Sequence, residues 1–239
     1  MALAVNAAQH CLDHKDPLSV SCHYMNKTLE KCDADLEVRV LNEGRSSSTV
    51  EVTISQQDKI ASKFLATFGT LDRFSGFTAI NDTAPSLPPV DDCINASILM
   101  RKVNGGHLKI ANTFDMCVAK DSEFAKTVLA GKQNGPKAEL IAWIRFTEER
   151  TFCLRSLTFF LDALPPPVLN MVPSDWVPTL EYTAHCWATP NPNDKWLRAR
   201  FVSMHVENGL LHTDGDIWSE DGMRLYAKSR QLARVLTKK

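Results

Sequence analysis

Hydrophobic and polar residues follow one another in blocks that predict one helix and then four strands in the first part of the chain. Helical spacing of apolar residues over positions 3–13 predicts a helix, or the remainder of one. Alternating stretches predict strands at residues 19–25, 35–41, 49–55 and 60–68. Turn residues at 42–45 indicate that successive strands pair antiparallel, as a meander.

The second part of the chain contains a longer series of the same kind. Two strands are predicted at residues 108–118 and 138–146, and a helix with an apolar face follows at residues 154–164. The three prolines at 165–167 end this helix, because proline cannot continue its hydrogen bonding. Four more strands are predicted at residues 179–187, 196–207, 211–218 and 224–236.

A proline-bearing segment at residues 85–92 separates the two series, and Asn104-Gly105-Gly106 is typical of a turn. We therefore divide the chain into an N-terminal unit at residues 1–70, a connector at 71–106 and a C-terminal unit at 107–239.

The two units repeat one layout at an offset of 161 to 166 residues. Three pairs of blocks align in order: 18–24 with 180–186, 35–40 with 196–201, and 60–63 with 225–228. Two similar units in one chain suggest a fused pseudo-dimer, with any site at the junction between them. By this symmetry the first unit lacks its opening strands, so we expect it to be incomplete at its start.

Charge and cysteine content exclude several classes of protein. The chain has 27 basic and 28 acidic residues without a basic run, which argues against binding to nucleic acid or to an anionic membrane. Its apolar start has no basic residue and is interrupted by Asn6, so it fits neither a secretory signal nor a membrane span. Seven cysteines without CxxC spacing are typical of free thiols in a reducing compartment. These features predict an intracellular protein.

Polar residues suited to catalysis occur only in the second copy. Glu181 aligns with Ser19, and Gln231 aligns with Leu65. A carboxylate in a mostly apolar strand is costly to bury without a partner, and function is one common reason to accept that cost. Glu181 has two structural alternatives, which are exposure to solvent and pairing with an arginine on a neighbouring strand, either Arg200 or Arg230.

The direction in which Gln231 points follows from the alternation of its strand. Ser229, Gln231, Ala233 and Val235 share the less charged face, so we expect Gln231 to point inward. An inward amide needs hydrogen-bond partners, and a bound water is one of them. A purely structural amide is an equal alternative.

Other chemistries find no support in the sequence. His185, His205 and His212 lack ligand-like spacing with the cysteines, so we expect no metal site. The chain has no Gly-x-Ser-x-Gly elbow and no phosphate-binding glycine loop. The cysteines have no evident catalytic setting, and no cofactor is predicted.

Six segments, taken in order, carry a resemblance to a known family. They are residues 16–24, 37–50, 159–166 (Phe-Phe-Leu-Asp-Ala-Leu-Pro-Pro), 178–185, 196–200 and 221–231. Together they resemble the double-hotdog acyl-CoA thioesterases, in the branch related to the bacterial type II enzymes. The resemblance implies an α+β fold, a tandem hotdog in which each unit has a long helix wrapped by a curled antiparallel sheet. The two sheets would join edge to edge, and the first hotdog would be incomplete at its N-terminus.

The resemblance also implies an activity, which is hydrolysis of an acyl-CoA or related thioester to a free acid and a thiol by an activated water, without a covalent intermediate. Carried over by position, the family's aspartate maps to Glu181 and its glutamine to Gln231. Its hydroxyl residue maps to Ser203, with Thr183 as a second candidate. Glu181 would orient or deprotonate the water, Gln231 would position it, and Ser203 would hold the water or the carboxylate. A backbone amide at a helix N-terminus would stabilise the oxyanion.

The partners implied are an acyl-CoA or acyl-thioester substrate, and no cofactor, nucleic acid or membrane span. A homo-oligomer is expected from the resemblance alone, and the cytoplasm or the peroxisome is the expected compartment. The alternative function is a hotdog that binds an acyl ligand, or acts in assembly, without turnover. A dehydratase ranks last, because that chemistry needs a histidine with a carboxylate on the helix, and the helix at 154–164 offers only Asp162.

Overall fold

The first unit consists of one helix and four consecutive strands, as the alternation of its sequence predicts. The computed structural model describes residues 1–103, 109–174 and 176–236. The expected turn at 104–106 and the expected strand start at Leu108 lie outside these ranges. The elements of the first unit are α1 (Ala2–Cys11), β1 (Asp16–Tyr24), β2 (Asp35–Glu43), β3 (Ser48–Gln56) and β4 (Lys59–Gly69).

The second unit contains the same set of elements and more. They are β5 (Ile94–Asn95), α2 (Ala96–Val103), β6 (Phe114–Val118), β7 (Glu139–Phe146), α3 (Leu154–Ala163), β8 (Thr179–Cys186), β9 (Leu197–Val202), β10 (Val206–Glu207), β11 (Leu210–Trp218) and β12 (Leu225–Arg234). Three predictions need correction. The strand expected at 108–118 begins only at Phe114, the strand expected at 196–207 divides into β9 and β10, and α2 was not predicted.

Within the described residues, twelve strands form one antiparallel sheet, in the order β2-β3-β4-β1-β8-β12-β11-β9-β7-β6-β5, with β10 paired to β11. The two units meet where β1 pairs with β8, in a register that runs from Ser19 opposite His185 to His23 opposite Glu181. The sheets therefore join edge to edge. This α+β arrangement is the tandem hotdog that the sequence predicts.

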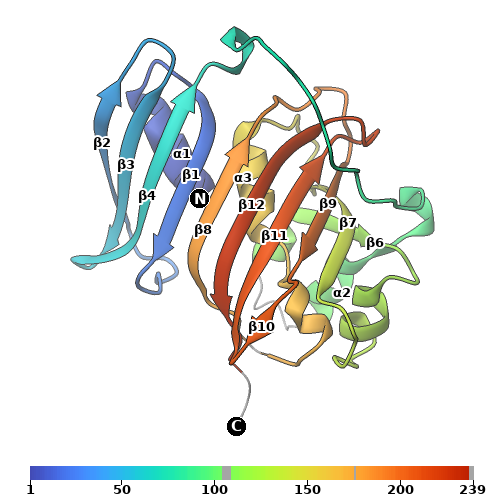
Figure 1. The fold of residues 1–239 in the computed structure, drawn as a ribbon. Coiled ribbons are helices and arrows are strands. Elements are labelled where there is room, and N and C mark those ends of the chain that lie inside the picture. The colour runs from blue at the N-terminus through green and yellow to red at the C-terminus, as the bar shows by residue number, and fades with distance from the viewer. Residues whose placement is uncertain (104–108, 175, 237–239) are drawn as a thin grey trace.

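Helices α1 and α3 lie next to each other on one face of the sheet (Figure 1). Alternate residues of the strands point toward them and form the core with the apolar faces of both helices. Phe160 of α3 is fully buried, and the centroid of its ring lies 4.6 Å from that of Phe146 in β7, with the two rings tilted by 39°. The helix-facing side of the sheet is thus the buried side. Among the described residues, no helix combines the length and apolar character needed to cross a membrane.

The connector crosses the opposite, outer face of the second sheet (Figure 1). The Asp82 carboxylate accepts a hydrogen bond of 2.6 Å from Lys228 in β12 and pairs with Arg200 in β9 at 3.3 Å. Further along, the indole of Trp143 in β7 donates to the carbonyl oxygen of Pro88 at 2.8 Å. These contacts tie the connector to strands that are far from it in the sequence.

Candidate active site

A row of polar side chains runs across the helix-facing side of three neighbouring strands. Tyr182 of β8 lies opposite Gln231 of β12, and Gln231 lies opposite Thr213 of β11. The row continues to Ser203, just after β9, whose hydroxyl is 2.7 Å from that of Thr213. Directly opposed residues of an antiparallel sheet share one face, so these four side chains lie under the helix layer. The row brings together two of the predicted residues, Gln231 and Ser203.

The inward direction of Gln231 is confirmed. Its neighbours on the same face, Ser229, Ala233 and Val235, are all buried. Its facing partner Tyr182 is 1% exposed and donates its phenol hydrogen to the carbonyl oxygen of Leu161 in α3. The Gln231 amide donates a hydrogen bond to the hydroxyl of Thr179. This bond also supports the alternative, that Gln231 is a purely structural amide.

A half-buried carboxylate lies on the helix above this face of the sheet. Asp162 of α3 accepts a hydrogen bond of 2.7 Å from the phenol of Tyr24 in β1. Burial raises the pKa of Asp162, while the hydrogen bond from Tyr24 opposes that rise. Burial also raises the pKa of Tyr182, and the nearby charge of Asp162 adds to that effect. Asp162 thus combines a perturbed pKa with a place at the junction of the two units, which is typical of a functional carboxylate.

Glu181 and Thr183 point to the other face of the sheet. Thr183 donates a hydrogen bond of 2.6 Å to the Glu181 carboxylate, and its hydroxyl is 3.0 Å from that of Ser21 in β1. Both residues alternate with Tyr182, whose side chain faces α3. The structure therefore does not bring Glu181 and Gln231 together, because the sheet lies between their side chains. A role of Glu181 or Thr183 in hydrolysis stays a prediction.

Neither of the arginines considered for Glu181 pairs with it in the structure. Arg200 bonds to Asp216 and to Asp82, and Arg230 bonds to Asp214 at 2.7 Å. The half-buried Glu181 carboxylate is instead satisfied by the hydroxyl of Thr183 on its own strand.

The internal repeat can now be aligned through the sheet register. At the offset of 162 residues that relates Leu18 to Leu180, Tyr182 corresponds to Val20. Val20 pairs with Ala66 and Tyr182 pairs with Gln231, so the counterpart of Gln231 is Ala66 rather than Leu65. Burial agrees, because Ala66 is 4% exposed and Leu65 is 53% exposed. The first copy still has an apolar residue where the second has an amide. The corrected alignment therefore agrees with the earlier conclusion that polar residues suited to catalysis occur only in the second copy.

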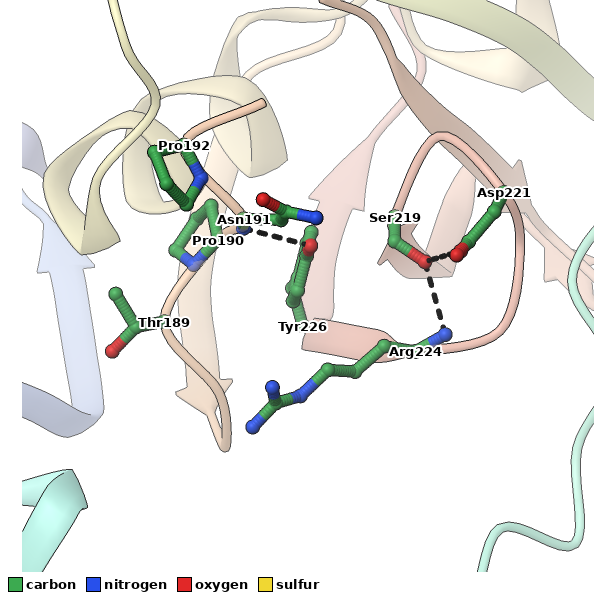
Figure 2. A pocket seen from close by; sticks show the side chains of 8 residues that line it. All are labelled: Thr189, Pro190, Asn191, Pro192, Ser219, Asp221, Arg224 and Tyr226. Atoms are coloured by element: carbon green, nitrogen blue, oxygen red, sulfur yellow. Dashed lines mark hydrogen bonds between the residues drawn. The ribbon is translucent and has the colours of Figure 1, made fainter. Parts of the chain in front are cut away.

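A small pocket lies at a different place, between the loop that follows β8 and the turn that joins β11 to β12 (Figure 2). It has a volume of about 330 Å³ and is lined by Thr189, Pro190, Asn191, Pro192, Ser219, Asp221, Arg224 and Tyr226. The Tyr226 phenol donates to Asp194 at 2.7 Å and accepts from the backbone amide of Asn191 at 2.9 Å. These bonds hold the loop between β8 and β9 against strand β12 and involve none of the residues of the polar row. Among the described residues, no group of three or more His, Cys, Asp or Glu could hold a metal ion.

Family comparison agrees with this geometry. Residues 103–235 match the model of the acyl-CoA thioesterase C-terminal domain, and residues 1–69 match that of the N-terminal domain. The chain therefore belongs to the acyl-CoA thioesterase family.

Solved structures of similar fold include a protein from Thermobifida fusca that is provisionally named a thioesterase II. It is 29% identical, with a TM-score of 0.83 over 99% of this chain and 84% of that one. An acyl-CoA thioesterase II from Mycobacterium marinum is 16% identical, with a TM-score of 0.74 over 99% of this chain and 87% of that one. At that level of identity the second likeness concerns the fold alone.

One curated sequence, the genome polyprotein of Mengo encephalomyocarditis virus, is 25% identical over 142 residues. The match includes 56% of this chain and 6% of the polyprotein, so the chain spans only a small part of that relative's length.

Sequence reasoning did not select Asp162, Tyr24 or Thr213. A signal for Asp162 was present, because it is the one carboxylate in the predicted helix at 154–164 and it lies next to the apolar Leu161. No pattern in the sequence shows that Tyr24, 138 residues away, donates to it.

Proposed function

We propose that this protein hydrolyses an acyl-CoA, or a related thioester, by direct attack of water on the helix-facing side of the sheet. The observation that carries the proposal is the half-buried carboxylate of Asp162, with its raised pKa, at the junction of the two units. It lies near the Tyr182–Gln231 pair, in a chain whose halves both match acyl-CoA thioesterase domains.

In the proposed reaction Asp162 acts as the general base. It removes a proton from a water whose oxygen attacks the thioester carbonyl carbon, and the Gln231 amide orients that water. The tetrahedral intermediate then collapses and the carbon–sulfur bond breaks. The proton that Asp162 took from the water passes to the departing thiolate, which leaves as the thiol, and Asp162 is ionised again. Ser203 and Thr213, at the end of the row, are placed to bind the polar part of the substrate or the product carboxylate.

A second function, binding of an acyl ligand without turnover, has its own supporting observation. Gln231 donates to Thr179, and the hydroxyls of Ser203 and Thr213 lie 2.7 Å apart, so these groups satisfy one another. In hydrolysis the amide of Gln231 would have to exchange the Thr179 hydroxyl for water. A binding protein would need no such exchange.

The deciding experiment measures thiol release from acyl-CoAs of increasing chain length, from acetyl to palmitoyl, with a blank for the seven cysteines of the protein. We expect Asp162→Asn to lower kcat/KM by about 10²- to 10⁴-fold, because it removes the general base. Gln231→Ala should lower kcat/KM by about 10-fold or more. Glu148→Gln, at an exposed loop carboxylate, is the matched control and should stay within a few-fold of the parent protein, and Glu181→Gln tests the role predicted for Glu181.

The opposite pattern, with loss in Glu181→Gln and full activity in Asp162→Asn, would return the catalytic role to Glu181. Circular dichroism of each variant shows whether a loss of rate reflects a loss of fold. Tight binding of an acyl-CoA by the folded parent protein without thiol release would establish the second function.

A further inference from the structure

Three consecutive prolines follow α3 and leave the last carbonyl oxygens of the helix without their usual donors. In an α-helix each carbonyl oxygen accepts from the backbone amide four residues further on, and proline has no amide hydrogen. Residues 165–167 are all proline, so they cannot donate to the carbonyl oxygens of residues 161–163. The turn of α3 that carries Asp162 therefore needs donors from outside the helix.

Tyr182 supplies one of these donors from the sheet. Its phenol donates to the carbonyl oxygen of Leu161, the residue next to Asp162 in the chain. The Tyr182 side chain is buried, and a buried phenol needs such a partner. Burial, and after it the nearby charge of Asp162, raises the pKa of Tyr182, so the phenol lies close to this carboxylate as well. The bond thus fixes the backbone beside the proposed base.

Tyr182 also lies at the centre of the junction between the two units. In the register of the sheet it faces Gln231 of β12 on one side and Cys22 of β1 on the other. One side chain thus connects the helix turn of the proposed base with the strand position beside the amide that orients the water. Tyr24 binds the carboxylate of Asp162 itself, whereas Tyr182 binds the backbone of its turn.

We propose that Tyr182 is a positioning residue, which holds Asp162 at the distance from Gln231 that hydrolysis requires. Its phenol takes no part in the proton transfers and acts through the carbonyl group of Leu161. The inference rests on the proposed function, because it assigns no reaction of its own. A misplacement of about 1 Å in an active site can cost a factor of about a hundred in rate, so the loss of this bond should affect the rate directly.

Tyr182→Phe tests the proposal, because it removes the phenol oxygen and keeps the ring that fills the core. With the acyl-CoA that the parent protein hydrolyses fastest, we expect kcat to fall about 10- to 100-fold, while KM stays within about twofold. The acidic limb of the pH profile should not move, because the Tyr182 phenol donates to the Leu161 carbonyl oxygen and not to the Asp162 carboxylate. Circular dichroism checks that the variant is folded at the temperature of the assay.

Tyr226→Phe is the matched control and should leave kcat unchanged. It removes another buried phenol of the second unit, whose bonds to Asp194 and to the amide of Asn191 hold a loop outside the candidate site.

A double-mutant cycle separates positioning from a general effect on the fold. If Tyr182 acts through Asp162, Tyr182→Phe should lower the residual rate of Asp162→Asn by less than about threefold, because the base that it positions is already absent. An equal loss in both backgrounds would overturn the inference, and so would an unchanged kcat or a shifted acidic limb in Tyr182→Phe. The proposed function fails separately, if the parent protein releases no thiol or if Asp162→Asn keeps full activity, and the inference then fails with it.

Discussion

Asp162 owes its properties to two opposing effects on one carboxyl group. Burial under the sheet junction disfavours the ionised form, and the Tyr24 hydroxyl, 2.7 Å away, favours it. A base for hydrolysis needs both, because a fully solvated carboxylate is a weak base and a buried one without a donor stays protonated at neutral pH.

Tyr24→Phe should therefore change the pH dependence of hydrolysis. Without the donor the pKa of Asp162 rises further, and since the base must be ionised, the acidic limb of kcat/KM should move to higher pH. A hydrogen bond to a charged group contributes roughly 1.5–3 kcal/mol, so we expect a shift of about one to two pH units. The matched control is Tyr226→Phe, which removes a second 2.7 Å tyrosine–aspartate bond, at Asp194, outside the candidate site. An unmoved profile in Tyr24→Phe would argue against Asp162 as the base.

At the scale of single residues, alternation decides what the sequence could predict. It correctly places Gln231 inward, because Ala233 and Val235 share its face. The same rule applied to β8 puts Glu181 with Thr183 and His185, opposite the buried Tyr182 and Ala184. The outward direction of Glu181 was therefore available from the pattern, whereas the reach of Tyr24 to Asp162 depends on tertiary packing.

At the scale of elements, ion pairs of Asp82 hold the connector against strands β9 and β12. Asp82 has its pKa lowered to about 2, chiefly by the hydrogen bond from Lys228, with a further contribution from Arg200. A carboxyl group whose pKa is lowered by folding stabilises the folded state at pH values above its pKa in the unfolded chain, about 4. That stabilisation is lost as the pH falls toward 2. The Asp82 side chain is 31% exposed, so screening by solvent limits its contribution to about 1 kcal/mol or less.

Asp82→Asn should accordingly lower the free energy of unfolding at pH 7 by up to about 1 kcal/mol, and the difference should shrink as the pH falls from 4 toward 2. Urea unfolding at several pH values measures this, with the exposed Asp91→Asn on the same connector as the control. A difference that stays constant down to pH 2 would show that the ion pair is not its source.

The elements that were predicted correctly are those in which hydrophobic residues recur at a single regular spacing. The strands β1 to β4 alternate over their whole length, and α3 presents a continuous apolar face. The region around α2 contains only short elements, the eight residues of α2 and the two of β5, so no periodic pattern there is long enough to predict them. Strand β9 ends at Val202, although the backbone amide of Ser203 still donates to the carbonyl oxygen of Ala138 at 2.9 Å, in the register that pairs β9 with β7.

At the scale of the whole molecule, the pairing of β1 with β8 makes the two units one sheet with one core. We therefore expect them to unfold together. The chain offers a direct measurement, because all five tryptophans (Trp143, Trp176, Trp187, Trp196 and Trp218) lie in the second unit. Tryptophan fluorescence reports on that unit, while far-ultraviolet circular dichroism reports on both, and the two transitions in urea should coincide. Separate midpoints would mean that the units are independent in stability.

The hydrogen bond between Tyr24 and Asp162 joins residues on opposite sides of the connector. A cut in the connector would leave the carboxylate on one fragment and its donor on the other. Under the proposed mechanism neither fragment alone would carry the complete base, and activity would return only as the fragments associate through β1 and β8. The protein would then act as a split reporter, in which the rate of thiol release measures the concentration of reassembled protein.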